Sequence, residues 1–161
     1  MRYLALDAQI AKCEQHLKDT QTANTEVEFY LSQFLLVRIC AEFESRIKLL
    51  IERRCARTND VYIKRFVQKS ARKVWRDFKI GDITGNLGHF GEDYGKNFRD
   101  LIDDQLIAVW DNIYTNRHAV AHSAGTQMSL RELKEAYIKS QAVLEAVVLA
   151  LVLKPRELKN L

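Results

Sequence analysis

Residues that break helices are scarce in this chain, and their scarcity limits the folds that it can adopt. The chain has one proline, at position 155, and six glycines, all of which lie between Gly81 and Gly125. Proline and glycine interrupt helices more strongly than other residues do. Apolar residues recur at three- and four-residue intervals through the long stretches that contain neither. The sequence therefore predicts an all-α protein.

Capping signals and apolar periodicity divide the chain into about five helices. Thr25 with Glu28, and Ser129 with Glu132, have the spacing of a capping box, in which two side chains satisfy the first free N–H groups of a helix. The helices are expected over residues 3–20, 25–55, 60–78, 97–123 and from 129 to just before 155. Gly125 is placed to end the fourth of them. This number and length of helices indicates a helical bundle.

The 161 residues fit one domain, so residues 1–161 are interpreted as a single helical unit. The interval 79–97 holds five of the six glycines and separates the third expected helix from the fourth. We expect it to be a glycine-rich loop inserted before the fourth helix, with at most one short helical turn. Long loops in compact domains are often functional.

The cysteines and the apolar segments indicate a cytoplasmic protein. Cys13, Cys40 and Cys55 are odd in number and lack C-x-x-C spacing, so neither a disulfide framework nor a structural zinc site is expected. The N-terminus lacks the apolar core of a signal peptide. The most apolar run, residues 142–153, contains Glu145 and is too short to cross a bilayer. It is expected to be a buried helix or, as the weaker alternative, an oligomer interface.

Positive charge is concentrated in one part of the chain. Residues 46–79 contain twelve lysines and arginines against three acidic residues, although the net charge of the whole chain is only +4. On the helix expected over 60–78, a basic stripe is formed by Arg65, Lys69, Arg72, Lys73 and Arg76. Such a stripe favours a polyanion, and we expect it to bind RNA phosphates without reading their sequence. The alternative is an ordinary solvated helix face.

Three aromatic residues, Tyr62, Trp75 and Phe78, interleave with the basic stripe. Aromatic rings beside basic side chains can stack on unpaired RNA bases. The helical spacing of these residues favours the other interpretation, in which they pack in the core or wall a groove.

The stretch TNRHAVAHSAG, residues 115–125, places ionisable residues among small ones near the end of the fourth expected helix. His118 and His122 are four residues apart and share a helix face. Arg117 and His122 lie about 140° apart around the axis and can still border one cleft. The carbonyl end of a helix favours a nearby cation by about 0.3–1 kcal/mol. Histidine exchanges protons near neutral pH and arginine braces phosphate, which together suffice for RNA cleavage without a metal.

Two simpler interpretations apply to the same residues. Arg117 can be a surface arginine and His122 a residue that caps the last carbonyl groups of the helix. The H-x-x-x-H spacing of His118 and His122 also occurs in zinc sites, but Ala119 stands where metalloproteases carry a glutamate. No third metal ligand is evident, so neither a metal nor another cofactor is expected.

The arrangement Arg117-His118-Ala-Val-Ala-His122, late in a helix of a small bundle, resembles the motif of the HEPN domain family. That motif is an arginine, often followed by a polar residue, and a histidine after four to six intervening residues. The stretch 83–125, in which NLGHFGEDYG leads into a helix that ends in RHAVAHS, is most similar to the RiboL-PSP-HEPN branch. The first half of the chain shares the helix pattern.

The resemblance implies a metal-independent endoribonuclease that acts as a homodimer, with the two motifs facing each other across the interface. It assigns Arg117 and His122 as the catalytic pair and His118 as the variable polar position. Proteins of this kind are toxins of toxin–antitoxin pairs or effectors of antiviral defence, so an antitoxin or defence partner is implied. Some carry a tyrosine two residues after the histidine, which a partner modifies. Ala124 occupies that position here, so this form of regulation is not expected.

Two functions are therefore carried forward. The first is cleavage of RNA to 2′,3′-cyclic phosphate and 5′-hydroxyl ends. The second is a non-catalytic HEPN-like module that binds RNA, a nucleotide or a protein partner through Arg117 and His122. Glu42 and Glu44, in the second expected helix, are candidates to orient Arg117, although i,i+4 pairs within their own helix are the simpler expectation.

Overall fold

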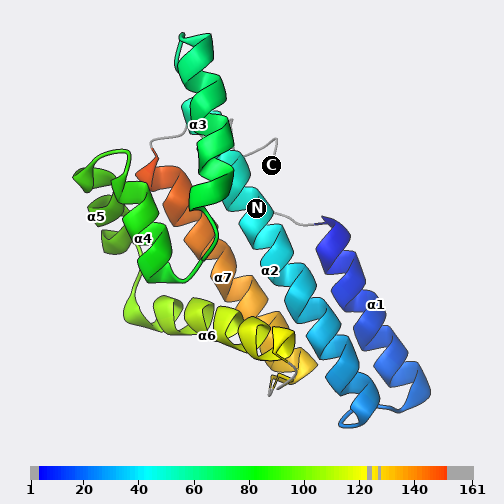
Figure 1. The fold of residues 1–161 in the computed structure, drawn as a ribbon. Coiled ribbons are helices and arrows are strands. Elements are labelled where there is room, and N and C mark those ends of the chain that lie inside the picture. The colour runs from blue at the N-terminus through cyan, green and yellow to red at the C-terminus, as the bar shows by residue number, and fades with distance from the viewer. Residues whose placement is uncertain (1–3, 123–124, 127, 152–161) are drawn as a thin grey trace.

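The computed structural model describes residues 4–122, 125–126 and 128–151. Its described part contains no strand and is made of helices alone, which confirms the all-α prediction. There are seven helices rather than about five: α1 (Leu4–Thr20), α2 (Glu26–Cys55), α3 (Val61–Val74), α4 (Ile80–Gly88), α5 (Glu92–Asp100), α6 (Asp104–Ala121) and α7 (Leu130–Ala150). Figure 1 shows α1, α2 and α7 side by side, with α6 packed across α7 and α2 and with α3 projecting from the bundle.

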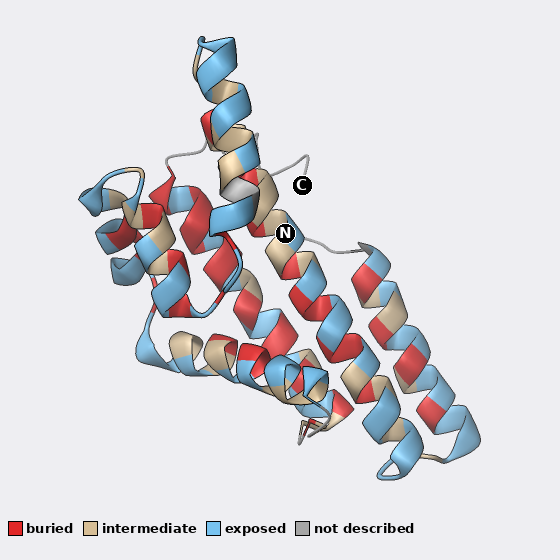
Figure 2. Cartoon of the chain, viewed as in Figure 1, coloured by how far each residue is buried: buried red, intermediate tan, exposed pale blue. Residues whose placement is uncertain are grey.

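The long helix α2 is the centre of the bundle because α1, α3, α6 and α7 all contact it. Its buried residues lie next to those of α7, as Figure 2 shows. The ring of Phe43 stacks on Trp110 of α6 and on Tyr137 of α7, with ring centroids 5.0 and 6.0 Å apart. The apolar run that begins at position 142 is buried here up to Leu151, apart from exposed residues such as Leu149. The expectation of a buried last helix is therefore confirmed over its described part.

The helix ends follow local signals in most cases. Ser129 and Glu132 form the expected capping box at the start of α7. At the start of α2, Thr25 caps the N–H of Val27, but the expected capping box does not form. Glu28 instead accepts hydrogen bonds from the backbone N–H groups of Asn24 and Leu130, and so joins the starts of α2 and α7.

The glycine-rich interval is helical, which corrects the expectation of a loop over 79–97. Helices α4 and α5 occupy most of it, and Gly91, with a φ of 138°, allows the turn between them. A side chain at Gly95 would place its Cβ only 2.7 Å from the backbone oxygen of Thr84. This glycine therefore lets two helices pack closely rather than keeping the chain irregular.

The helix expected over 97–123 is divided in two. Helix α5 ends at Asp100, and α6 begins after Asp103, whose carboxylate accepts a hydrogen bond from the N–H of Leu106. At the other end α6 stops at Ala121, before Gly125, which adopts a φ of 74° and packs against the ring of Phe29. Positions 123, 124 and 127 lie outside the described residues.

Helix α3 departs most from the prediction. It starts as expected at Asp60, whose carboxylate accepts from the N–H groups of Tyr62 and Ile63. It ends at Val74, before the predicted end at residue 78. Helical periodicity places Ile63, Val67, Val74 and Phe78 on one core face, but Ile63 is 53% and Val74 45% exposed, because α3 packs mainly on α2 and projects beyond it. Val67 is partly buried, and Phe78, which lies beyond the end of α3, is buried.

Two expectations about the chain as a whole can be compared with the described residues. Cys13, Cys40 and Cys55 are all buried and free, so no disulfide joins them. None of the helices described is both long enough and apolar enough to cross a lipid bilayer.

Candidate functional site

The last turns of α6 carry the residues that the sequence singled out. Arg117 and His118 lie within the helix and are exposed, and His122 is the residue that ends it. The backbone N–H of His122 bonds the carbonyl groups of His118 and Ala119 at 3.1 and 3.2 Å. Its φ of −101° and ψ of 21° leave the helical range. The backbone of His122 therefore closes α6 while its side chain stays exposed.

The two histidine side chains lie together. The ring centroids of His118 and His122 are 4.3 Å apart, with their planes inclined at 57°. This is the shared face that the four-residue spacing predicts. Within the part of the chain that the structure describes, no group of three or more histidine, cysteine or acidic side chains is arranged to hold a metal ion.

Arg117 reaches back to α2. Its guanidinium lies 3.6 Å from the carboxylate of Glu44, whose side chain is only 18% exposed. Burial raises the pKa of Glu44, and the charges of Arg117 and Lys48 partly oppose that rise. Glu42 does not join this pair, because its carboxylate bonds Arg46 one turn along α2 at 2.7 Å. Of the two glutamates considered as partners of Arg117, the structure brings Glu44 to it.

A groove of about 390 Å³ opens beside Arg117 and His118, and we call it the motif groove. It is lined by Glu44, Arg76, Asp77, Phe78, Lys79, Asp82, Tyr114, Thr115, Arg117 and His118. One wall is therefore α6, and the other is the segment that joins α3 to α4. Arg117 comes from the first wall and Arg76 and Lys79 from the second, so the groove offers donors to a phosphate, although Glu44, Asp77 and Asp82 also line it.

The segment that forms the second wall is fixed to α6. The indole N–H of Trp110 donates to the backbone oxygen of Phe78 at 2.6 Å, and the N–H of Ile80 donates to Asp111 at 2.9 Å. The rings of Phe78 and Tyr114 also stack, with centroids 6.2 Å apart. These contacts hold Arg76 and Lys79 at the rim of the motif groove.

Two residues near the pair of Arg117 and Glu44 are not singled out by the sequence interpretation: Tyr114, which lines the motif groove, and Cys40. Tyr114 is 6% exposed, and burial raises the pKa of its hydroxyl well above the usual value. Cys40, on the facing side of α2, is fully buried, and burial together with the charge of Glu44 raises its pKa to about 12. The sequence did carry a signal for Tyr114, because it stands one helical turn before Arg117.

The basic stripe begins on α3 and ends at Arg76, just beyond that helix, and two of its members, Arg65 and Lys69, line a hollow with Glu52 of α2. Arg65, Lys69, Lys73 and Arg76 are exposed, and the side chain of Arg72 lies outside the described part of the structure. Among the stripe residues whose side chains are described, Arg76 alone lines the motif groove, so it links the two surfaces.

The aromatic residues near the stripe divide into two kinds. Tyr62 is 82% exposed and lies near the start of α3, whereas Trp75 and Phe78 are buried. Their rings lie 6.1 Å apart under the segment that follows α3. The interpretation of Trp75 and Phe78 as core and groove-wall residues is confirmed, and Tyr62 is left as the exposed ring beside the stripe.

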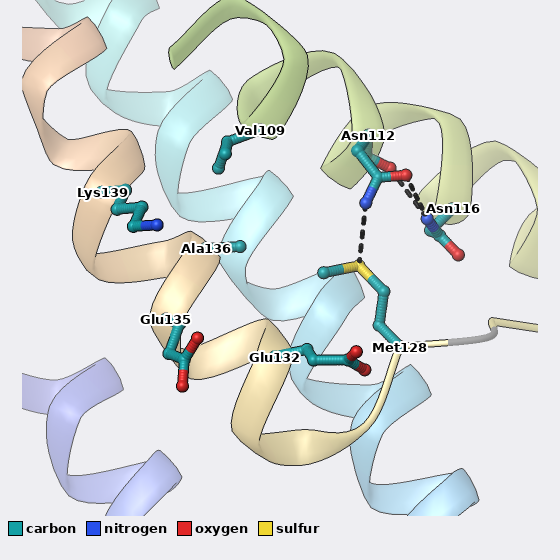
Figure 3. A pocket seen from close by; sticks show the side chains of 8 residues that line it. All are labelled: Val109, Asn112, Asn116, Met128, Glu132, Glu135, Ala136 and Lys139. Atoms are coloured by element: carbon teal, nitrogen blue, oxygen red, sulfur yellow. Dashed lines mark hydrogen bonds between the residues drawn. The ribbon is translucent and has the colours of Figure 1, made fainter. Parts of the chain in front are cut away.

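A second hollow, of about 420 Å³, lies on the other side of α6 against α7, as Figure 3 shows. Glu132 and Glu135 line it, and their carboxylates repel phosphate. Its structural importance lies in Asn116, which donates to the backbone oxygen of Asn112 and accepts from the hydroxyl of Thr126. These bonds tie the motif end of α6 to the segment that follows it.

The architecture and the motif together define the class of the protein. An all-helical bundle presents Arg117, His118 and His122 at the end of one helix, which is where the resemblance to HEPN domains places the motif, and Arg117 and His118 line a groove of mixed charge. A sequence model of the RiboL-PSP-HEPN family matches residues 2–152 of the 161. The chain therefore belongs to the RiboL-PSP-HEPN family, whose members are inferred to be ribonucleases. No curated protein and no solved structure matched the chain significantly.

Proposed function

We propose that this protein is a metal-independent endoribonuclease of the HEPN type. The observation that carries the proposal is the meeting of Arg117 and His118, with His122 beside them, at a groove that also has Arg76 and Lys79 on its rim. An imidazole supplies a base and acid at neutral pH, and guanidinium groups stabilise the charge of a pentavalent phosphate. These are the groups that transfer of a phosphate to a neighbouring hydroxyl requires.

In the proposed reaction, His122 accepts the proton of a ribose 2′-hydroxyl as the oxygen attacks the adjacent phosphorus. Arg117 donates to the non-bridging oxygens as negative charge builds on them. The bond from phosphorus to the 5′ oxygen breaks, and that oxygen takes a proton from an imidazolium, either that of His118 or that of a motif from a second subunit. The products are a 2′,3′-cyclic phosphate and a 5′-hydroxyl.

The basic stripe of α3 supports RNA as the substrate. Its exposed arginines and lysines are suited to bind phosphates whatever the base sequence, and the stripe reaches the motif groove at Arg76. We therefore propose that RNA follows α3 into the groove, and that its affinity falls steeply as salt concentration rises. The exposed ring of Tyr62 is available to stack on an unpaired base.

The test of the proposed function is cleavage of a mixed RNA pool by the purified protein in the presence of EDTA. We expect fragments that end in cyclic phosphate, which resist ligation at the 3′ end until a phosphatase with cyclic phosphodiesterase activity has acted on them. Binding of RNA without any change in its length, across a range of salt concentrations, would contradict the proposal and favour a non-catalytic binding module.

Family membership also motivates a proposal for the cellular role. We propose that the protein is a toxin or defence effector whose activity a partner protein restrains. Its expression alone is then expected to arrest cell growth, and Arg117→Ala is expected to relieve the arrest. Equal arrest by both proteins would contradict this role without bearing on cleavage in vitro.

We further propose that the protein acts as a homodimer through the exposed side of α2. An apolar stripe on the N-terminal half of this helix is formed by Val27, Tyr30, Phe34, Val37 and Ala41, at alternating spacings of three and four. Phe34 is 50% exposed and Tyr30 63%. Ala41 lies one helical turn before Glu44, which lines the motif groove, so the apolar stripe leads toward that groove. Packing two such stripes together would bring the two motifs near each other.

Phe34→Glu is expected to convert the dimer to a monomer, because the interface would have to bury an unpaired carboxylate. The dissociation constant of the dimer, measured by sedimentation, should be at least about 100-fold higher than that of the wild type, since burying an unpaired carboxylate costs about 3 kcal/mol or more. RNA cleavage should fall in parallel. Leu149→Glu is the matched control, because Leu149 is 60% exposed on α7, the helix whose apolar run was the earlier candidate interface. Dissociation caused by Leu149→Glu and not by Phe34→Glu would assign the interface to α7.

A further inference from the structure

The hydroxyl of Tyr114 is buried beside the motif groove and has no hydrogen-bond partner among the residues that the structure describes. The residue as a whole is 6% exposed. A buried hydroxyl that makes no hydrogen bond costs free energy, because it has lost the bonds that it made to water. Such groups are rare in folded proteins, and each one needs an explanation.

Two helical turns face each other around this hydroxyl. Tyr114 and Arg117 form one turn of α6, and Cys40 and Glu44 form one turn of α2. The charges of Glu44 and Arg117 both act on the Tyr114 hydroxyl. Because burial keeps the pKa of Tyr114 well above its usual value, this hydroxyl stays protonated and is a donor. The thiol of Cys40, whose pKa is about 12, also stays neutral. The anionic acceptor in the cluster is the carboxylate of Glu44.

In the structure, Arg117 forms a long ion pair with the carboxylate of Glu44. The nitrogen and oxygen atoms are 3.6 Å apart, longer than the 2.7–2.9 Å that is usual for a charged hydrogen bond. The side chain of Arg117 is 44% exposed, so it has room to turn toward the groove. When it does so, Glu44 is left as a largely buried anion close to the bound phosphate. An unpaired buried charge of this kind opposes binding.

We propose that Tyr114 is a positioning residue that takes over Glu44 when an RNA phosphate draws Arg117 away. This inference rests on the proposed function of Arg117. In the free protein Arg117 is paired with Glu44 and the hydroxyl is unpaired. In the RNA complex Arg117 is paired with phosphate, and the Tyr114 hydroxyl donates to Glu44. The hydrogen bond that is missing in the free protein is thus formed only with substrate present.

The proposal predicts that loss of the Tyr114 hydroxyl lowers activity without lowering stability. Tyr114→Phe removes a hydroxyl that makes no bond in the free protein, so its resistance to urea is expected to equal or exceed that of the wild type. Its kcat/KM for RNA is expected to fall by about 10- to 100-fold, which is the usual effect of losing a hydrogen bond to a charged group. Tyr137→Phe is the matched control, because the hydroxyl of Tyr137 does make a bond, to Asp7 at 2.8 Å. That variant should lose stability and keep its kcat/KM.

A double-mutant cycle with Glu44→Gln tests whether Tyr114 acts through Glu44. Once Glu44 is neutral, the departure of Arg117 leaves no buried anion behind. Tyr114→Phe should then change kcat/KM by about three-fold or less, since a neutral hydrogen bond contributes little. An equal loss in both backgrounds would overturn the proposal and assign Tyr114 a role independent of Glu44.

The pH dependence gives a second readout that a purely structural role would not move. The titratable and charged groups around Glu44 come from three places. Helix α6 contributes Arg117, Tyr114 and His118, and α2, the helix of Glu44 itself, contributes Cys40 and Lys48. The segment around the start of α4 contributes Arg76, Asp77, Lys79 and Asp82. The pKa of Glu44 is already raised by burial, and removal of Arg117 raises it further. As pH falls, Glu44 becomes protonated in the complex and no longer needs a donor. The ratio of wild-type to Tyr114→Phe kcat/KM should therefore shrink toward acid pH, and a constant ratio would contradict the exchange.

The failure of this inference can be told from the failure of the proposed function. If the wild type cleaves RNA and the cycle is additive, only the exchange is wrong. If the wild type binds RNA without cleaving it, the four proteins of the cycle are compared by their dissociation constants for single-stranded RNA. Tyr114→Phe should then weaken binding in the wild-type background and have little effect in the Glu44→Gln background. A wild type that neither cleaves nor binds RNA would overturn both.

Discussion

Arg117→Ala and His122→Ala proteins are each expected to cleave RNA at least about 100-fold more slowly than the wild type, in EDTA and at saturating RNA. Loss of a donor to the developing charge on phosphate, or of the group that moves the 2′-hydroxyl proton, removes between about 10²- and 10⁴-fold of rate. Both side chains are exposed at the end of α6, so neither substitution removes a core contact. Initial rates with a fluorescent RNA, measured beside unfolding curves, would separate chemistry from stability.

Two further variants make this prediction specific. Arg117→Lys keeps the positive charge but loses the planar guanidinium, and should remain well below wild-type activity. His16→Ala removes an exposed histidine from α1 and should cleave at the wild-type rate. His118→Ala is expected to fall between these cases, since His118 lines the motif groove and supports its neighbour. Full activity of His122→Ala would exclude this histidine as the proton-transfer group.

Trp110→Ala is expected to lower the free energy of unfolding by about 3–5 kcal/mol, the usual effect of truncating a buried aromatic side chain. Trp110 is fully buried and stacks on Phe43 of α2. Its indole N–H also supplies the hydrogen bond to the backbone oxygen of Phe78, which would be left without that donor. Urea unfolding followed by circular dichroism measures the loss.

Trp110→Phe divides this effect into its parts. It retains an aromatic ring but removes the indole N–H, and is expected to cost about 1–3 kcal/mol because a buried carbonyl loses its partner. Since that carbonyl belongs to a wall of the motif groove, cleavage should fall as well. A loss below about 1 kcal/mol for Trp110→Ala would mean that the core closes around the gap, contrary to the close packing seen here.

The parts of the fold that the sequence predicted are those set by neighbours in the chain. The capping box at Ser129 and the cap at Asp60 depend on residues two or three positions away, and the burial of α7 follows from a long apolar run. The helices α4 and α5 were missed because glycine was interpreted by its conformational freedom. Gly95 instead allows close contact with Thr84, eleven residues earlier, and no local pattern reveals such a contact.

The residues of the candidate site also fall into two groups: those that neighbours in the chain reveal, and those that only the fold brings together. Arg117, His118 and His122 were found because they are adjacent in the chain, and the spacing of the two histidines predicts their contact. The sequence indicates Arg76 and Phe78 separately but not that their segment meets α6, because the contacts that join the two are made between positions about thirty residues apart. The exposure of Ile63 and Val74 on α3 has no sequence signal, because an amphipathic pattern shows that a face is apolar but not whether the rest of the chain covers it.

The central position of α2 has a consequence for synthesis on the ribosome. Helices α6 and α7, which cover its inner side, emerge long after it, so the nascent chain carries an uncovered apolar helix while those later segments are made. Glu44 and Arg117 come from α2 and α6, and the core beneath them needs Tyr137 of α7. The motif groove therefore cannot form until translation has passed α7. An incomplete chain is expected to be harmless to the RNA from which it is being read.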